Sequence, residues 1–500
     1  MPRAPRNCDE KSSGKRAANN SYIGDIAIMA HVCFINSCPD RNTIGLNSGS
    51  LWPPLGLASM AAFLGSKGYT ATIIDAWLEL LDNDIILQRI PEGSDYIGIN
   101  IDSFKFNVVQ DLCKKIKHQK QDIFIILGGP FAHVSPDLLL KEFACDCVVQ
   151  GEGEYALHEI IKARKTGITD FYDAPGVWWK GDDGIVRNTP QKRIMDLDSL
   201  PFPAYHLLPP LEKYKSFSRQ MPVAPLITSR GCAFSCSFCS RGCFRGQVVF
   251  RSAQHVLGEI DLLVTKYGIR QLDILDDNFI LHKERMEQIF DGIISRNYKL
   301  SINFNSGIRS EGLTKEHFVK MKQAGAIKVS FGIESADENV LKLCNKKLNL
   351  STIEKAVEYA RSAGIIVCGF FIIGLPGENE EAFQKTLQFA RKLQLDIANF
   401  CIAIPFPGTG LYKQISENGK FVSDTDRDLT HGFYGNKVFC LYGDQHEEEI
   451  LRRYKMAYRE FYSLGTLLRL FLKLRSFNEW AWVLKSGMSV IVNYVRGIFK

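Results

Sequence analysis

Three cysteines, Cys232, Cys236 and Cys239, lie within eight residues of one another. Spacings of three and two intervening residues let three thiolates on one loop converge on a single metal centre, and soft thiolates are typical iron–sulfur ligands. Three ligands leave one iron of a four-iron cluster open, and an open metal position is typical of a reactive site rather than a structural one. We therefore predict a reactive [4Fe-4S] cluster on this loop.

The alternative is a zinc site, or buried cysteines that bind no metal. Zinc usually needs a fourth Cys or His nearby, which Cys243 or His255 could supply. The loop follows a predicted strand, Leu226–Thr228, and ligands of barrel enzymes bind where strands end. This position favours the reactive cluster, with Cys243 as a non-ligand.

The elements that must position this loop form an α/β series that begins at Val223. Short apolar runs alternate with helical patterns such as Ala253–Lys266 and Thr352–Ala363, which indicates parallel strands joined by helices. Six such units fit a partial (β/α)6 barrel better than a doubly wound sheet, although periodicity alone does not separate the two. The predicted strands are Leu226–Thr228, Gln271–Leu275, Ser301–Asn305, Lys328–Gly332, Val367–Ile373 and Ile397–Ile404.

A second α/β pattern, typical of a Rossmann-like domain, precedes the barrel. Its predicted strands are Ile26–Ile35, Thr70–Ile74, Tyr96–Asn100, Ile123–Leu127 and Cys147–Gln150. The last two end in the glycine-rich loops 128–130 and 151–154, where ligands bind in open α/β sheets. The predicted organisation is a disordered tail (1–22), the α/β domain (23–165), a linker (166–220), the barrel (221–430) and a helical C-terminal segment (431–500).

The composition argues against nucleic acid as a partner and favours a cytoplasmic location. Half of the net charge of +6 comes from the polar tail, and no basic stripe with interleaved aromatics follows, so nucleic acid is not an expected partner. The 14 cysteines are scattered over 500 residues, and no leader pattern precedes the first apolar run near Ile26. We expect a cytoplasmic protein with reduced or metal-bound thiols. No apolar stretch reaches the roughly 18–20 residues of a membrane span.

The cysteine spacing, with Phe238 just before the last cysteine, resembles the radical S-adenosylmethionine (SAM) superfamily. The resemblance continues along the chain in motifs that end successive strands: Leu226–Cys232, Asp276-Asp277-Asn278-Phe279, Gly332-Ile333-Glu334-Ser335 and Gly374-Leu375-Pro376-Gly377-Glu378. It implies that SAM binds the open iron through its amino and carboxylate groups. One electron from the cluster would then cleave SAM to methionine and a 5′-deoxyadenosyl radical.

The resemblance also implies a set of residues around SAM. Glu334 and Ser335 can hold the ribose or the amino group, and Arg309 can pair with a carboxylate as a planar fork. Gly374 and Gly377 can let the backbone approach the adenine closely. The full candidate set is Phe238, Asp277, Arg309, Gly332, Glu334, Ser335, Gly374 and Gly377; no further catalytic side chain is assigned.

Residues 23–165 resemble the cobalamin-binding domain of one large subgroup, the class B radical SAM methylase-like enzymes. The matching stretches are Pro53–Leu57, Asp75, the glycine-rich loops and the linker Leu197–Pro203, and the candidate cobalamin contacts are Leu55, Ser103, Gly128, Gly129 and Glu152. The Asp-x-His-x-x-Gly motif that supplies a histidine to cobalt elsewhere is absent, as is common in the subgroup, so His133 is interpreted as a polar loop residue. The alternative is an α/β domain that binds nothing.

These resemblances imply a cobalamin-dependent enzyme that methylates an unactivated carbon of a small-molecule substrate. Its cofactors would be a [4Fe-4S] cluster, SAM and cobalamin, with an electron donor such as flavodoxin or ferredoxin. The alternatives are radical cyclisation or rearrangement without methylation, and a non-catalytic cobalamin or redox sensor, which would not need the SAM-binding set. A methylthiotransferase is disfavoured because the N-terminal cysteines, Cys33, Cys38, Cys113, Cys145 and Cys147, form no second cluster set.

The C-terminal segment combines basic residues with leucines and with Trp480 and Trp482. A basic helix with an apolar face and tryptophans can lie in a membrane interface, which would suit a lipid or isoprenoid substrate and peripheral membrane association. A helical cap packed on the barrel explains the same pattern, because apolar residues run almost around the helix between Leu467 and Leu474. The two readings predict different environments for the tryptophans.

Overall fold

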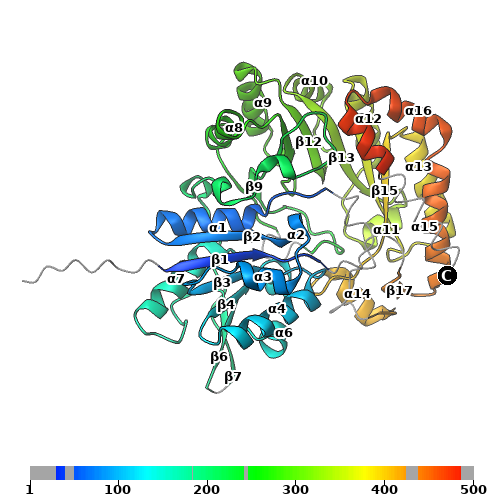
Figure 1. Ribbon diagram of the computed structural model, residues 1–500. Coiled ribbons are helices and arrows are strands. Elements are labelled where there is room, and N and C mark those ends of the chain that lie inside the picture. Colours follow the sequence, from blue (N-terminus) through cyan, green and yellow to red (C-terminus); the bar gives the residue numbers. More distant parts are fainter. Residues whose placement is uncertain (1–29, 40–49, 183, 241–245, 424–436, 486–500) are drawn as a thin grey trace, which may run out of the picture.

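The computed structural model describes residues 30–39, 50–182, 184–240, 246–423 and 437–485. Figure 1 shows two α/β units side by side, the N-terminal one in blue and cyan and the second in green and yellow. The last helices, in orange and red, lie along the outer side of the second unit. The predicted tail, residues 1–22, and Cys243 lie outside the described residues.

The first unit contains a seven-stranded sheet with the order β2-β1-β3-β4-β5-β6-β7. Strands β1 to β5 pair in parallel, as the alternating pattern predicts. Their bounds are β1 His31–Asn36, β2 Thr70–Asp75, β3 Tyr96–Asn100, β4 Phe124–Gly128 and β5 Cys147–Val149. Predicted and observed ends of β2 to β5 differ by at most one residue, because buried parallel strands appear as short apolar runs.

Helices cover both faces of this sheet, so it has two apolar cores. Helices α1 (Leu55–Ser66) and α7 (Gly153–Lys165) pack on one face through residues such as Leu64 and Ile160. The core on the other face includes Leu112 of α4. The remaining helices of the unit are α2 Ala76–Glu79, α3 Asn83–Arg89, α4 Phe106–Gln119, α5 Pro130–Val134 and α6 Pro136–Glu142.

A hairpin extends the sheet into the segment that the sequence predicts as a linker. Strands β6 (Val177–Gly181) and β7 (Gly184–Arg187) pair antiparallel, and β6 pairs with β5. The hairpin covers the edge that β5 would otherwise expose. Its strands are only four and five residues long, too short for an alternating pattern to stand out.

The second unit is a six-stranded, all-parallel sheet in which the strands follow one another in chain order, β8-β11-β12-β13-β14-β15. This order is that of a partial (β/α)6 barrel, because a doubly wound sheet would reverse direction at a switch point. The strands are β8 Val223–Leu226, β11 Gln271–Ile274, β12 Ser301–Ile308, β13 Ala326–Glu334, β14 Ile366–Ile373 and β15 Ile397–Ile402. The outer helices are α8 Ala253–Tyr267, α9 Lys283–Arg296, α10 Lys315–Gln323, α12 Leu350–Ser362 and α13 Glu380–Lys392.

Strand β8 ends two residues earlier than predicted. The cause is Asp276, whose carboxylate accepts hydrogen bonds from the backbone N–H and the hydroxyl of Thr228, at 2.6 and 2.5 Å. Thr228 therefore leaves the ladder, and the chain forms the short pair β9 (Ser229–Arg230) and β10 (Val249–Phe250).

The C-terminal segment is helical in its described part. Helix α15 (Glu447–Phe461) packs on β15, and the Tyr458 hydroxyl donates to the Phe400 carbonyl. Helix α16 (Leu464–Lys473) and the helical residues 477–485 follow. A search of the described chain for a helix long and apolar enough to cross a bilayer finds none.

Two hydrogen bonds, one buried and one partly buried, join the units. The Tyr214 hydroxyl, from the segment that leads into the barrel, donates to the Asp75 carboxylate at the end of β2, at 2.7 Å. Trp52, from the first unit, reaches the barrel and donates its indole N–H to Asp273 on β11, also at 2.7 Å. Burial raises the pKa of both carboxyl groups. The hydrogen bonds from Tyr214 and Trp52 act in the opposite direction, because they stabilise the ionised forms.

Candidate active site

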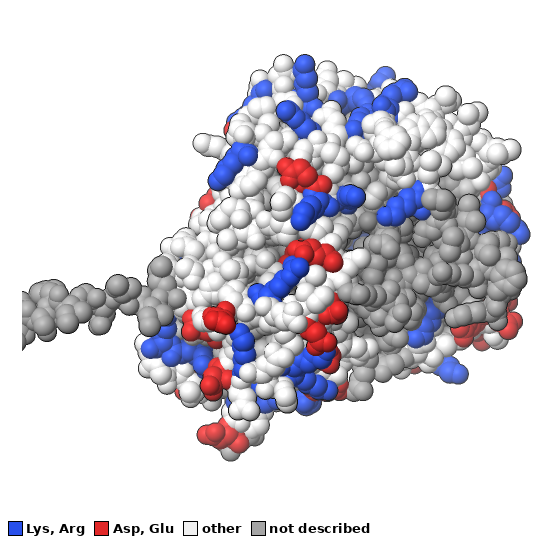
Figure 2. All heavy atoms as spheres, in the orientation of Figure 1, with Lys and Arg blue, Asp and Glu red and all other residues white. Residues whose placement is uncertain are grey.

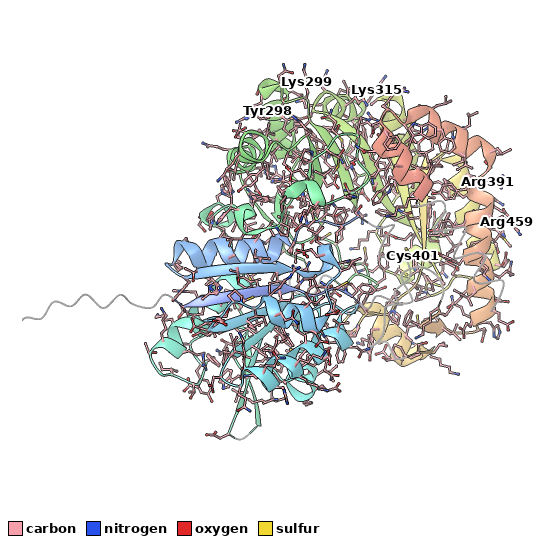
Figure 3. The ribbon with its side chains drawn as sticks, viewed as in Figure 1. Tyr298, Lys299, Lys315, Arg391, Cys401 and Arg459 are labelled. Atoms are coloured by element: carbon pink, nitrogen blue, oxygen red, sulfur yellow. The ribbon has the colours of Figure 1, made fainter. Side chains whose placement is uncertain are left out.

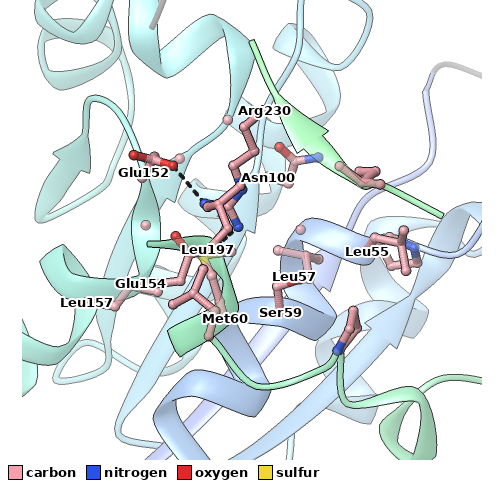
Figure 4. A pocket seen from close by; sticks show the side chains of 18 of the residues that line it. Leu55, Leu57, Ser59, Met60, Asn100, Glu152, Glu154, Leu157, Leu197 and Arg230 are labelled. Carbon is pink, nitrogen blue, oxygen red and sulfur yellow. Dashed lines mark hydrogen bonds and ion pairs between the residues drawn. The ribbon is translucent and has the colours of Figure 1, made fainter. Parts of the chain in front are cut away.

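A cavity of about 410 Å³ lies between the two units, at the carboxyl ends of their strands. Figure 4 shows its walls: the start of α1, the loop after β5 and the residues just before the cysteine loop. The segment Leu197–Pro203 also lines it, with Leu197, Leu200, Pro201, Phe202 and Pro203. The cavity therefore contacts both glycine-rich loops and Gly231, the neighbour of Cys232.

The structure brings most of the candidate cobalamin contacts together. Leu55, Gly128, Gly129 and Glu152 line the cavity, whereas Ser103 is not among the residues that line it. Gly129 has a φ of +108°, a left-handed conformation that glycine adopts without strain. A backbone free of side chains at these strand ends is suited to close approach by a large flat ligand.

Two histidines, His133 and His255, are candidates for a cobalt ligand. His133 is not among the residues that line the cavity; it lies in α5, and burial lowers its pKa. His255 lines the cavity from α8, but its Nδ1 accepts a hydrogen bond from Arg251 at 3.0 Å. These environments agree with a cobalamin site without a histidine ligand.

Glu152 carries an ion-pair network across the junction. One oxygen pairs with Arg230 at 2.8 Å, and the other pairs with Arg193 at 3.3 Å and accepts the Ile194 N–H at 2.7 Å. Arg230 also pairs with Glu154 at 2.6 Å, and Figure 4 shows these side chains meeting at the cavity wall. Burial alone would lower the pKa of Arg230, but Glu154 and Glu152 outweigh it and the net shift is upward. The Glu152 carboxylate is thus engaged by protein on both oxygens.

The cysteine loop is held from several sides. The Ser237 N–H donates to the Cys344 carbonyl at 2.8 Å, the Gly246 N–H to the Cys232 carbonyl at 3.0 Å, and the Asn345 amide to the Ser235 hydroxyl at 2.8 Å. Cys236 is buried, while Cys232 and Cys239 are partly exposed. The thiolates therefore come from a fixed loop that is open on one side.

Within the described residues, no three Cys, His, Asp or Glu side chains converge as ligands of one metal ion. Ligands of a single tetrahedral zinc ion must lie about 4 Å apart. Thiolates that each bind a different iron of a cluster are further apart. The three thiolates of the loop are soft ligands of the kind that hold [4Fe-4S] clusters.

Two cations stack on the aromatic residues of this loop. The Arg309 guanidinium lies 3.8 Å from the ring centre of Phe234, and the Lys346 ammonium lies 5.9 Å from that of Phe238. Burial raises the pKa of the Cys236 thiol, while the positive charges of Lys346 and Arg309 act in the opposite direction. Positive charge so placed compensates the thiolates that a cluster requires.

Lys346 is a candidate that the sequence motifs did not indicate. Its ammonium pairs with Glu334 at 2.9 Å, and both side chains are more than nine-tenths buried. Gly332 lies against both, since a Cβ there would be 2.8 Å from the Glu334 carboxylate and 3.1 Å from the ammonium. This buried pair of opposite charges matches the amino and carboxylate groups at the amino-acid end of SAM. Its only sequence signal is a lysine just after the helical turn α11 (Glu338–Leu343).

The other candidates lie at the ends of their strands. Arg309 pairs with Glu311 at 2.6 Å, and its Nη1 is buried without a hydrogen-bond partner among the described residues. The side-chain oxygen and nitrogen of Asn278 are also buried without a hydrogen-bond partner among the described residues. Asp277 lines the cavity. Unsatisfied buried polar atoms are costly, so these groups fit a site that a polar cofactor completes.

Ser335, Gly374 and Gly377 have protein partners. The Ser335 hydroxyl contacts that of Thr386 at 3.1 Å. Both glycines have a φ of +82°, and a Cβ would meet Ile450 at Gly374 and Leu343 at Gly377. The turn geometry and its packing therefore require glycine at both positions.

Comparisons with known proteins agree with these features. Two family models match the chain, the radical SAM superfamily over residues 226–390 and the B12 binding domain over residues 41–161. An uncharacterized methyltransferase of Pyrococcus horikoshii is 33% identical over 396 residues, which cover 78% of this chain and 84% of that protein. The cytidylyl-2-hydroxyethylphosphonate methyltransferase of Streptomyces wedmorensis is 30% identical over 463 residues, covering 82% and 86%. The anaerobic magnesium-protoporphyrin IX monomethyl ester cyclase of Rubrivivax gelatinosus is 27% identical over 472 residues, covering 87% and 84%.

A solved structure shares the whole fold. The radical S-adenosylmethionine methyltransferase TsrM of Kitasatospora setae, with a tryptophan substrate and a SAM analog bound, aligns with a TM-score of 0.70. The alignment covers 94% of this chain and 100% of that chain at 16% identity. At this identity the likeness establishes the common arrangement of the two units and nothing about the substrate.

If Lys346 binds the SAM carboxylate, we expect Lys346→Met to weaken SAM binding by about 10–100-fold, the loss expected for one charge-assisted hydrogen bond. Iron content should stay unchanged, because Lys346 is not a ligand. Equilibrium dialysis of SAM and the change that SAM causes in the electron paramagnetic resonance spectrum of the reduced cluster would measure this. The exposed neighbour Lys347 supplies the control, Lys347→Met. Unchanged SAM affinity in Lys346→Met would contradict the assignment.

Glu378 should make stability depend on pH. Burial raises its pKa to about 7, although the Gly374 N–H donates to it at 2.9 Å. A raised pKa means that its stabilising contribution is complete below the unfolded-state pKa and is lost as the pH rises through 7. Between pH 5 and 8 the loss should reach on the order of 3 kcal/mol. Glu378→Gln should therefore gain thermal stability relative to the wild type as the pH rises, and the exposed Glu381→Gln should not. If the melting temperatures of Glu378→Gln and the wild type changed in parallel from pH 5 to 8, the prediction would be wrong.

Proposed function

This chain belongs to the radical SAM superfamily, in the group that also carries a B12-binding domain, and on that premise we propose that it methylates an unactivated carbon of a small-molecule substrate. One observation carries the proposal: a single cavity contacts both the glycine-rich loops of the B12-binding domain and the start of the cluster loop. A methyl group held by cobalamin and a radical made at the cluster must reach the same substrate. A shared space between the two units supports that requirement.

When bound, the reduced cluster supplies the electron that cleaves SAM, and cobalamin supplies the methyl group. The chain's own residues position these groups. Cys232, Cys236 and Cys239 would hold three irons and leave the fourth for SAM. Lys346 and Glu334 would hold the amino-acid end of SAM between opposite charges. Arg230 keeps the cluster loop against the B12-binding domain.

Cyclisation or rearrangement without methylation is the second candidate, because one relative is named a cyclase. Both reactions need the same cluster, SAM and B12-binding domain, so the site geometry described above is compatible with either. A non-catalytic sensor would not need the buried charge pair beside the cluster loop. The reaction class is best separated by the products formed from SAM.

The partners follow from the chemistry. A radical SAM enzyme needs a small-molecule substrate and an electron donor, and as part of the proposal we name a flavodoxin or ferredoxin as the donor. We also place the enzyme in the cytoplasm, since no disulfide joins the described cysteines. On the face shown in Figure 2, acidic and basic side chains are interspersed, which suits a soluble donor better than nucleic acid.

Anaerobically reconstituted protein loaded with cobalamin should convert SAM to two products. Formation of 5′-deoxyadenosine reports the radical half of the reaction, and S-adenosylhomocysteine reports transfer of the SAM methyl group to reduced cobalamin. Chromatography coupled to mass spectrometry measures both. A methylase should form both products, whereas a cyclase should form 5′-deoxyadenosine alone. Absence of both would contradict the enzyme assignment.

Two cysteine variants, one inside the cluster loop and one outside it, test the proposed ligand set. Cys236→Ala should lose the cluster and all 5′-deoxyadenosine, because two thiolates hold a cluster poorly. Cys113→Ala changes a cysteine of α4 in the first unit, and it should keep both. If Cys236→Ala kept iron and SAM cleavage, the proposed ligand set would be wrong.

Peripheral membrane contact through α16 is a separate proposal. Leu464, Leu468 and Leu472 are 87%, 60% and 64% exposed and recur every fourth residue, so they share one face of the helix. The opposite face packs on the barrel base through Leu470. Trp480 stacks on Phe471 but is 38% exposed, and Trp482 is only partly buried, so neither tryptophan is buried as the cap interpretation expects. The lipid or isoprenoid substrate expected from the sequence is supported by the exposed leucines and by Phe477, which is 84% exposed.

Flotation with anionic phosphatidylglycerol vesicles tests this contact. The intact protein should float at low salt and less at high salt, because Lys and Arg near an anionic surface contribute roughly 1 kcal/mol each. The triple variant Leu464→Ser/Leu468→Ser/Leu472→Ser should stay in the lower fraction, whereas Ile168→Ser, on a distant exposed residue, should float. Failure of the intact protein to float would end the proposal.

A further inference from the structure

The inner face of the partial barrel carries many polar side chains. Outward-facing residues such as Phe304, Val329 and Phe400 belong to the apolar core shared with the helices. The alternate residues face inward, because successive side chains of a strand point to opposite sides. The apolar Phe370, Ile372 and Ile397 are among them. We call the polar side chains and the cysteines of this face the lumen residues: Asp273, Asn303, Asn305, Lys328, Ser330, Cys368, Asn399 and Cys401.

The lumen is open rather than filled by its own side chains. Asn399 is exposed, and Asn305, Lys328 and Cys401 are partly exposed, although all four lie on strands of the central sheet. Figure 3 shows Cys401 inside the molecule, while Lys299 and Lys315 extend outward at its periphery. In a tightly packed barrel these positions would be buried.

The base of the lumen is closed by a hydrogen-bonded plug. The Phe217 carbonyl accepts from the side chains of Gln271 and Asn303, at 3.0 and 2.7 Å. Asp273 accepts from Trp52, Gln271 and Asn303, at 2.7, 3.1 and 3.0 Å. The carboxylate of Asp273 is thus fully engaged by neutral donors.

Lys328 lies at the level of this plug, because the strands pair Asp273 with Asn303 and Asn303 with Lys328. Its ammonium makes no hydrogen bond or ion pair with any described residue, and it lies 5.2 Å from the centre of the Phe217 ring. Burial lowers its pKa, with only partial opposition from Cys368 and Asp273. Three further groups are buried without hydrogen-bond partners: Asn303 Oδ1, Asn305 Nδ2 and Ser330 Oγ.

These groups lie directly below the cluster and SAM residues. Lys328, Ser330, Gly332 and Glu334 alternate along β13 and face the same side. At about 3.3 Å per residue, Ser330 is roughly 13 Å below Glu334. Between these two levels, Gly307 of β12 packs closely against β13, since a Cβ at Gly307 would meet the Gly332 backbone at 2.9 Å and the Phe370 ring at 3.2 Å. Ser330 and Glu334 therefore share the inner side of one strand, with this closely packed level between them.

We propose that the lumen binds a hydrophilic substrate through an acidic group, a carboxylate or a phosphate, that pairs with Lys328. Hydroxyl or amide groups of the same molecule would hydrogen-bond to Asn303, Asn305 and Ser330. The proposal rests on the proposed function for the reaction that occurs there, but the acid-binding site is a property of the lumen alone. It names the substrate class that the SAM chemistry would act on.

A lipid or isoprenoid chain fits this lumen poorly. A buried polar atom left without a partner destabilises the complex, and an unpaired ammonium does so more strongly. A hydrocarbon would also displace the water that now reaches Asn399 and Lys328. An acidic, hydroxylated ligand removes these costs, so the polarity of the lumen selects against apolar substrates.

The test uses reconstituted holoenzyme with [13C]acetate and inorganic phosphate as probes and acetamide as the neutral counterpart. Line broadening in 13C and 31P nuclear magnetic resonance should show saturable binding of both anions to the wild type. Lys328→Met should weaken this at least tenfold, because the only lumen cation is lost among the described residues. The peripheral Lys315→Met should bind like the wild type, and acetamide should bind neither protein. Equal anion binding by Lys328→Met and the wild type would overturn the proposal.

Two further readouts separate folding from function. Lys328→Met should melt no lower than the wild type, since it removes a buried charge that has no partner. Ser330→Val keeps the cation and should still bind acetate, at reduced affinity. Formation of 5′-deoxyadenosine tests the proposed function independently. If the wild type formed none, the proposed function would be wrong, but the anion-binding result would still hold. Displacement of acetate by neutral farnesol would instead identify an apolar site and overturn the proposal.

Discussion

The arrangement of the active site depends on a buried ion-pair network between two domains. Glu152 and Glu154, both 4% exposed, lie at the end of β5, and burying carboxylates costs several kcal/mol each unless they are paired. Arg230 pairs with both, and it is separated from Cys232 by one residue. If the domains moved apart, both carboxylates would lose their ion pair with Arg230. The same network therefore fixes the B12-binding loop and the cluster loop relative to each other, which is the geometry that two cofactors acting on one substrate require.

Much of this architecture could be predicted from the sequence because its signals are local. A buried parallel strand appears as a short apolar run, and β2 to β5 were located within one residue. The cysteine spacing likewise lies within one loop. Contacts between distant residues left no such signal: Arg230 and Glu152 are 78 positions apart, and Lys346 reaches Glu334 only after α11 turns the chain back. The hairpin β6–β7 was missed because its strands are short and pair only once β5 is in place.

Motifs located strand ends well but did not reveal what each residue does there. In Asp276-Asp277 the first carboxylate holds Thr228 and ends β8, while the second lines the cavity. Glu378 accepts the Gly374 N–H and thereby closes its own turn. Glu152 lines the cavity, yet its oxygens are occupied by Arg230, Arg193 and Ile194. A residue type at a strand end suits ligand binding and turn formation equally, and only the contacts separate the two uses.

The barrel strands carry a second pattern that becomes meaningful only in three dimensions. In β13, Val329, Phe331 and Ile333 pack against helices, while Lys328, Ser330 and Glu334 alternate with them on the inner side. In a doubly wound sheet covered by helices on both faces, such inward polar residues would be unfavourable. A partial barrel encloses space, so it can keep them hydrated or paired with a ligand. The parallel order of all six strands therefore explains how a strand of the central sheet can contain a lysine.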